Sequence, residues 1–141
     1  VEKDVISYSL GWENDCFMPW LHPDDPDVTV FVALQMFQNI ILGSDDNLHV
    51  GPYLYQQDKV TTTFTLKMFT GYVNDIYHPE IVAAYDVEGR NGLVRGTMTY
   101  NPPWSSKYKI DLIYVNYWGR FENMGLFREK DSAFLKLRYM W

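Results

Sequence analysis

The sequence predicts an all-β protein, an antiparallel up-and-down transmembrane β-barrel with about seven or eight strands in 141 residues. Apolar and polar residues alternate with a period of two over long stretches, and helical periodicity is almost absent. Aromatic residues make up 17% of the chain, yet the mean hydropathy is −0.27. The last strand presents apolar residues on one face and two cations on the other. A barrel in lipid uses both faces, because lipid contacts the apolar face and an aqueous lumen contacts the polar one.

Three segments in the N-terminal half show this alternation. Aliphatic or aromatic residues occupy every second position, mostly with small or hydroxylated residues between them, which indicates strands with one apolar face. Gln38 is an exception, because it falls on the apolar side. The segments and their apolar residues are 5–12 (Ile6, Tyr8, Leu10, Trp12), 28–42 (Val30, Val32, Leu34, Met36, Ile40, Leu42) and 60–73 (Val60, Phe64, Leu66, Met68, Tyr72).

Four further strands are expected in the C-terminal half. The turn after the first of them has Gly89, Asn91 and Gly92, residue types that accept positive φ readily. Pro102 and Pro103 end the second, since proline cannot donate to a β-ladder. The segments and their apolar residues are 79–87 (Ile81, Ala83, Tyr85, Val87), 93–100 (Val94, Met98, Tyr100), 107–118 (Tyr108, Ile110, Leu112, Tyr114) and 132–141 (Ala133, Leu135, Leu137, Tyr139, Trp141).

Aromatic residues are expected to gather at both ends of these strands, as they do at the two interfaces of a membrane barrel. With the C-terminus on the periplasmic side, short connections at 74–78 and 101–106 lie on that side and long ones at 43–59 and 119–131 lie outside. The connection at 13–27 is long but falls on the periplasmic side, without a physical explanation. The expected periplasmic group is Tyr72, Tyr77, Tyr100, Trp104, Tyr108, Tyr139 and Trp141, and the expected outer group is Tyr53, Tyr55, Tyr85, Tyr117, Trp118 and Phe121.

The strand number leaves two interpretations open for residues 1–141. Single-chain bacterial barrels usually have an even number of strands, with both termini in the periplasm. Seven strands would therefore require either an eighth, at about 50–56, or a larger barrel of which this chain is the C-terminal segment. The second interpretation is favoured, so other chains or a preceding part of the protein are expected to complete the barrel.

Composition excludes several functions. A net charge of −6 and a pI near 4.9 argue against binding to nucleic acid, which requires clustered cations. The single Cys16 cannot form an internal disulfide and has no neighbouring histidine that would make it a nucleophile. No apolar stretch reaches the roughly 20 residues of a transmembrane helix.

No catalytic or cofactor site is expected, so the protein is predicted not to be an enzyme. His22, His49 and His78 lie in different connections without metal-binding spacing, and solvated loop histidines are expected. Asp45 and Asp46 offer hard oxygen ligands and a weak possibility of calcium binding, but their loop lacks EF-hand spacing.

The polar face is the better candidate for function. In a wide barrel its charges would select permeating solutes, and in a barrel of about eight strands they would pair and fill the interior. Both alternatives remain open. The residues expected to line the lumen are Lys67, Glu80, Asp86, Arg95, Lys109, Asp111, Lys136 and Arg138.

Leu135, Leu137, Tyr139 and Trp141 resemble the C-terminal signature of bacterial outer-membrane barrels, an aromatic end preceded by alternating hydrophobic residues. Together with the segments 11–15, 33–37 and 79–86, this ending resembles a large family of uncharacterised Gram-negative outer-membrane barrel proteins. The resemblance implies contact with outer-membrane lipid and recognition of the last strand by the barrel-assembly machinery. It also implies passage of small or hydrophobic solutes, and it transfers no catalytic residues.

The expected function is a passive porin-like channel or a structural barrel in the bacterial outer membrane. The alternative is a soluble, lipocalin-like barrel that binds a small hydrophobic ligand inside an apolar face, and an outer-membrane barrel enzyme is a third, weaker alternative. The lipocalin-like interior would contain Ile6, Leu34, Phe64, Ile110 and Leu137.

Overall fold

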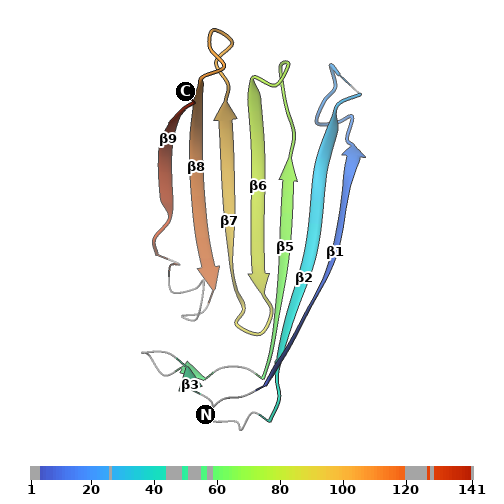
Figure 1. Ribbon diagram of the computed structural model, residues 1–141, viewed down its shortest axis with the longest axis vertical. Coiled ribbons are helices and arrows are strands. Elements are labelled where there is room, and N and C mark those ends of the chain that lie inside the picture. The colour runs from blue at the N-terminus through green and yellow to red at the C-terminus, as the bar shows by residue number, and fades with distance from the viewer. Residues whose placement is uncertain are drawn as a thin grey trace.

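The computed structural model contains one seven-stranded antiparallel sheet in which strands that neighbour in the chain also neighbour in space, apart from a small hairpin between β2 and β5 (Figure 1). The structure describes residues 4–25, 27–43, 49–50, 55–56, 59–119, 127 and 129–140. The all-β, up-and-down prediction is therefore confirmed. The strands of the sheet, in spatial order, are β1 (Val5–Phe17), β2 (Thr29–Ile41), β5 (Val60–Phe69), β6 (Tyr77–Asp86), β7 (Asn91–Tyr100), β8 (Tyr108–Gly119) and β9 (Ser132–Tyr139).

The described residues of the segment proposed as an eighth strand, Val50, Tyr55 and Gln56, do not join this sheet. They belong to two short strands, β3 (His49–Val50) and β4 (Tyr55–Gln56), which pair with each other in a separate two-stranded sheet. These residues therefore do not supply the missing strand, and residues 51–54 lie outside the described part of the chain.

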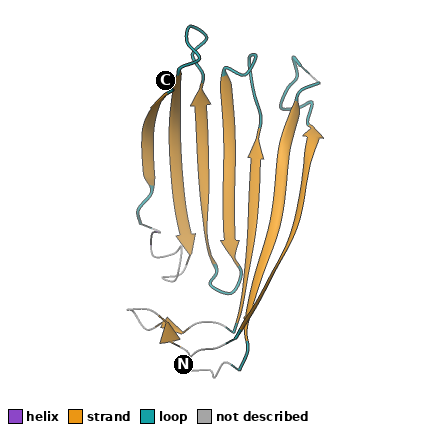
Figure 2. Ribbon diagram, viewed as in Figure 1, coloured by secondary structure: helices purple, strands orange, loops and turns teal. Residues whose placement is uncertain are grey.

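The sheet forms a single layer (Figure 2), and the described residues include no α-helix that covers either face. Nor is any helix in that part of the chain long and apolar enough to cross a membrane. Among the described residues, the apolar side chains of the sheet therefore have no second layer to pack against.

The pairing register places apolar residues opposite apolar residues on neighbouring strands. Trp12 lies opposite Leu34, and Leu34 lies opposite Leu66 on its other side. At the far edge, Leu112 lies opposite Leu135. Because side chains alternate between faces with a period of two, the face of one residue in a strand fixes the faces of all the others, which yields one apolar and one polar face.

The sheet is not closed, since no pairing joins β1 to β9 among the described residues. Seven antiparallel strands alternate in direction, so these two edge strands run the same way. The β1–β2, β5–β6 and β7–β8 connections lie at one end of the sheet, which is called the upper end here (Figure 1). The end of β9 lies at that end too, whereas the β2–β5, β6–β7 and β8–β9 connections lie at the lower end.

The long connection after β1 now has a physical explanation. β1 continues to Phe17, so the connection covers 18–28 rather than 13–27. Its His22 is buried, stacks on Tyr72 with ring centroids 4.2 Å apart, and places Nε2 2.9 Å from Oγ1 of Thr70. The Tyr72 hydroxyl donates to the carbonyl of Leu21. The connection is thus fastened to the neighbouring β5–β6 turn, and the expectation that His22 is solvated is wrong.

The β6–β7 turn differs from its expected chemistry in one respect. Positive φ falls on Arg90, at 48°, and not on a glycine or asparagine. Gly89 is required for space instead, since a Cβ there would come within 2.6 Å of the Asp86 carboxylate. The amide of Gly89 donates to that same carboxylate at 3.2 Å.

Gly92 and Gly96 lie on the apolar side of β7 and offer a matched test of the packing. A Cβ at Gly92 would lie 2.6 Å from Cζ2 of Trp118 and 2.7 Å from the backbone oxygen of Ala84, whereas a Cβ at Gly96 would meet nothing within 4 Å. We expect Gly92→Ala to lower the free energy of unfolding by about 1–3 kcal/mol, the usual cost of overpacking. Gly96→Ala should change it by less than about 0.5 kcal/mol, as substitutions at open positions do.

Chemical unfolding followed by tryptophan fluorescence measures both changes. Equal effects of the two substitutions would contradict the packing of Trp118 across β7.

Candidate functional site

The apolar face is the largest feature of the molecule. It runs across all seven strands of the sheet, and many of its large side chains are between 41% (Tyr85) and 72% (Leu137) exposed. A protein surface of this kind marks contact with another apolar phase or molecule. The exposed residues of this face are Ile6, Tyr8, Leu10, Trp12, Leu34, Phe64, Tyr77, Ile81, Tyr85, Met98, Tyr108, Leu112, Tyr114, Trp118, Leu135, Leu137 and Tyr139.

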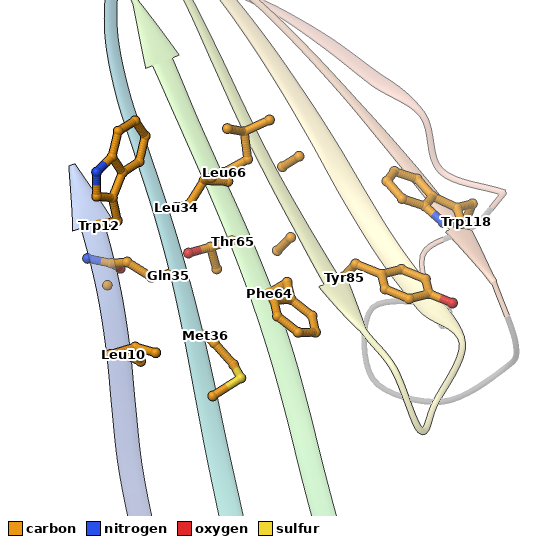
Figure 3. A pocket seen from close by; sticks show the side chains of 13 residues that line it. Leu10, Trp12, Leu34, Gln35, Met36, Phe64, Thr65, Leu66, Tyr85 and Trp118 are labelled. Carbon is orange, nitrogen blue, oxygen red and sulfur yellow. The ribbon is translucent and has the colours of Figure 1, made fainter. Parts of the chain in front are cut away.

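A groove of about 560 Å³ lies on this face between Trp12 and Trp118. Leu34 and Phe64 lie along its floor, with Tyr85 toward the Trp118 end (Figure 3). The groove is hollow where Ala83 of β6, opposite Leu66 in the ladder, presents only a methyl group to it. Its lining is almost wholly apolar, which suits a hydrocarbon chain.

Aromatic side chains form a row along the upper border of the apolar face. Tyr77 stacks on Tyr100 with centroids 5.3 Å apart, and Tyr108 contacts both Trp104 at 5.6 Å and Tyr139 at 5.1 Å. These five residues belong to the expected periplasmic group, and the structure brings them together. Amphipathic rings at one level are typical of the border between an apolar and an aqueous phase.

The lower aromatic group is described only in part. Tyr85 and Trp118 lie on the apolar face, on either side of Gly92 in the ladder. Tyr117 lies on the polar face and contacts Phe127, with centroids 5.4 Å apart, so it does not join them. Tyr53 and Phe121 lie outside the described residues, and Tyr55 lies in β4. From Tyr77 to Tyr85 the strand rises about 27 Å.

A hydrogen-bonded chain of polar side chains lies near the lower end of the apolar face. The Tyr8 hydroxyl donates to Gln38, whose amide donates to Oγ1 of Thr62 at 2.9 Å. Thr62 in turn donates through its backbone amide and its hydroxyl to Glu88, at 2.6 Å and 2.8 Å. The exceptional Gln38 is therefore fully paired, beyond the level of Tyr85 along the strands.

The polar face carries a charged cluster, defined as Lys67, Glu80, Arg95, Lys109, Asp111, Lys136 and Arg138. The ladder places all seven side chains on one face of β5–β9, in its upper half. Glu80 lies between two cations, 2.9 Å from Arg95 and 3.4 Å from Lys67. The sequence pattern alone predicted this grouping, because each residue falls on the polar side of its strand.

Asp111 is the buried anchor of the cluster. Its side chain is 5% exposed and accepts hydrogen bonds from Arg138 at 2.7 Å and from Thr99 at 2.8 Å. The three residues come from adjacent strands, β8, β9 and β7, so one carboxylate connects all three. A shallow depression of about 370 Å³ lies above this point, lined by Arg95, Lys136 and Arg138 among others.

One predicted residue of the polar face lies apart from the cluster. Asp86 is buried at the lower end of β6, where it accepts from the Gly89 amide. It lies on the polar face as expected, but at the lower end, where its carboxylate binds the β6–β7 turn. Leu135, Leu137 and Tyr139 lie exposed on the apolar face of β9, and Trp141 lies outside the described residues.

The polar face also carries aromatic rings that the sequence pattern did not single out. Phe31 stacks on Phe69 with centroids 4.8 Å apart, and the Lys67 ammonium lies 5.2 Å from the centroid of Phe69. The sequence did carry a signal for them, because each ring falls on the polar side of the alternating pattern of its strand. The polar face therefore carries aromatic rings as well as charges, and Lys67 forms a cation–π contact with Phe69.

Within the part of the chain that the structure describes, no group of three histidine, cysteine or acidic residues is placed to hold a metal ion. Asp45 and Asp46 lie outside those residues. Comparisons with protein families, curated proteins and solved structures found no match. The chemistry of the two faces therefore carries the functional inference.

Asp111 and Asp15 offer a matched test of the cluster, since both lie on the polar face of a strand. Asp111→Ala removes the buried acceptor of Arg138 and Thr99, and we expect it to lower the free energy of unfolding by about 2 kcal/mol. Asp15 is exposed in β1, and Asp15→Ala should change that free energy by less than about 0.5 kcal/mol.

Urea unfolding curves give both values. A cost for Asp111→Ala no larger than that for Asp15→Ala would show that the cluster contributes nothing to stability.

Proposed function

We propose that this chain forms a wall of an outer-membrane β-barrel, with the apolar face against lipid and the polar face against an aqueous lumen. The observation that carries the proposal is the apolar face, which spans all seven strands and has no layer over it among the described residues. For each exposed aliphatic or aromatic side chain of this face, burial in lipid would contribute about 1.5–3 kcal/mol to the stability of the protein.

The borders of the apolar face support the same function. The aromatic row from Tyr77 to Tyr139 would lie at one membrane interface, and Tyr85 and Trp118 at the other. The rise of about 27 Å between these levels along a strand approaches the roughly 25 Å height of an outer-membrane apolar band, although strand tilt shortens it. The polar chain through Gln38 and Thr62 would then lie toward the headgroups.

The open edges of the sheet bear on how such a barrel closes. β1 and β9 run in the same direction, so antiparallel closure takes an odd number of further strands. We propose that strands from outside residues 1–141, or from partner chains, supply them. The exposed alternation of Leu135, Leu137 and Tyr139 supports recognition of β9 by the barrel-assembly machinery. The resemblance to uncharacterised outer-membrane barrels agrees with this location.

We propose a passive, non-enzymatic role for the barrel, either as a porin-like channel for small or hydrophobic solutes or as a structural barrel. The polar face offers paired charges and hydroxyls of the kind that line aqueous passages.

The groove on the apolar face favours a second candidate, a soluble lipocalin-like barrel. If the sheet closed with this face inward, the groove between Trp12 and Trp118 would hold a small hydrophobic ligand. The two functions differ in solubility. A lipid-facing wall requires detergent or lipid, whereas monomeric, detergent-free protein in buffer would support the lipocalin-like alternative and exclude the membrane wall.

Leu112 and Thr97 provide the sharpest test of which face contacts lipid. Leu112 lies in the middle of the apolar face of β8, and Thr97 lies on the polar face of adjacent β7. In phosphatidylcholine vesicles, we expect Leu112→Arg to lower the free energy of unfolding by about 2–4 kcal/mol, which is the cost of a cation at the bilayer midplane. Thr97→Arg should cost less than about 1 kcal/mol, because it faces water.

Urea titrations of vesicle-bound protein, followed by tryptophan fluorescence and gel mobility, compare the two variants. If Thr97→Arg costs as much as Leu112→Arg, the assignment of the faces is wrong. Failure of the unmodified protein to fold into vesicles would reject the membrane wall itself.

A further inference from the structure

The charge of the cluster on the polar face is opposite in sign to that of the whole chain. The chain carries a net charge of −6. The charged cluster, in contrast, combines five cations (Lys67, Arg95, Lys109, Lys136, Arg138) with two carboxylates (Glu80, Asp111). The cluster is therefore a positively charged region within an acidic protein.

Both carboxylates of the cluster are already engaged. Glu80 pairs with Lys67 and Arg95, and Asp111 pairs with Arg138. Lys109 and Lys136 form no ion pair within 4.0 Å among the described residues. Lys136 lines the depression of about 370 Å³, as does Thr97, which carries a hydroxyl. Ammonium and guanidinium groups beside hydroxyl donors form a surface that attracts anions.

The other carboxylates of the polar face lie elsewhere. Asp86 is at the opposite end of β6, and Glu13 and Asp15 are on β1 at the far edge of the sheet. β1 is six strand spacings from β9, which is about 29 Å across the sheet. In the open sheet that separation exceeds the Debye length of about 10 Å at 0.1 M salt, and it still does so in a barrel that adds three or more strands between β9 and β1. These acids then do not cancel the charge around Lys136.

We propose that the charged cluster makes the passage anion-selective, with Lys109 and Lys136 as the selecting charges. The permeating solutes are small monovalent anions, either inorganic anions or short carboxylates. This inference rests on the proposed barrel wall, since it requires the polar face to border an aqueous lumen. Asp111 and Glu80 are positioning residues, because they hold the arginines against the wall and leave the two lysines to act on the solution.

A unit charge at about 7 Å in water changes the local concentration of a monovalent ion about threefold. With screening by salt, three net charges are expected to produce an anion preference of about fivefold. Reversal potentials across planar bilayers that contain the folded protein, in a gradient of potassium chloride and then of potassium acetate, measure this preference directly. We expect both anions to be preferred over potassium.

Charge variants localise the effect to the cluster. Lys109→Glu with Lys136→Glu should abolish or invert the preference. The matched control is Lys59→Glu with Lys130→Glu, which makes the same change in net charge at exposed positions at the lower end of the sheet and should retain it. Lys109→Gln with Lys136→Gln, a milder variant, should reduce the preference about threefold if the double reversal does not fold.

The outcomes separate the two proposals. An absence of insertion or of conductance from the complete barrel, this chain together with the strands that close it, rejects the barrel channel and the selectivity with it. Conductance that prefers potassium, or that keeps its anion preference in both the glutamate and glutamine variants, rejects the role of the cluster and leaves the barrel wall intact.

Discussion

The structure depends on one constraint, the register of antiparallel pairing between strands whose side chains alternate with a period of two. Pairing Trp12 with Leu34, and Leu34 with Leu66, commits every other residue of those strands to a face. A shift of one residue in any strand would turn its apolar residues to the polar side. The same register extends to Leu112 and Leu135 at the far edge, so one rule organises both faces.

A sheet organised in this way has no core of its own. Only Val30, Val32, Ile41 and Val115 are buried hydrophobic residues among those described, far fewer than a soluble domain of this size requires. The missing burial is the physical reason for the proposal that lipid covers the apolar face. Polar groups near its borders are consistent with this, because Gln38 and Thr62 satisfy each other and Glu88 away from the centre of the face.

On the opposite, polar face, the two carboxylates of the charged cluster are each paired with cations from neighbouring strands. Asp111 is buried yet holds Arg138 and Thr99 from two neighbouring strands, and Glu80 serves two cations at once. Such pairing connects β5 to β9 laterally while keeping the surface polar. The cations beyond this pairing give the charged cluster its positive charge, and that charge is the basis for the proposed selectivity.

The sequence by itself determined the strands, their faces and the grouping of Lys67, Arg95 and Arg138 on one side, because a period of two is readable residue by residue. It did not determine how His22 fastens the 18–28 connection, or that Asp86 serves a turn and not the cluster. The His22 contacts join residues far apart in the chain, for which local patterning carries no signal. Asp86 has the same alternation as the cluster residues, and the pattern does not show that its carboxylate binds the nearby Gly89 amide. The tertiary structure alone also decided that seven strands form an open sheet with β1 and β9 at its edges, since pairing at an edge depends on which strands are adjacent in space.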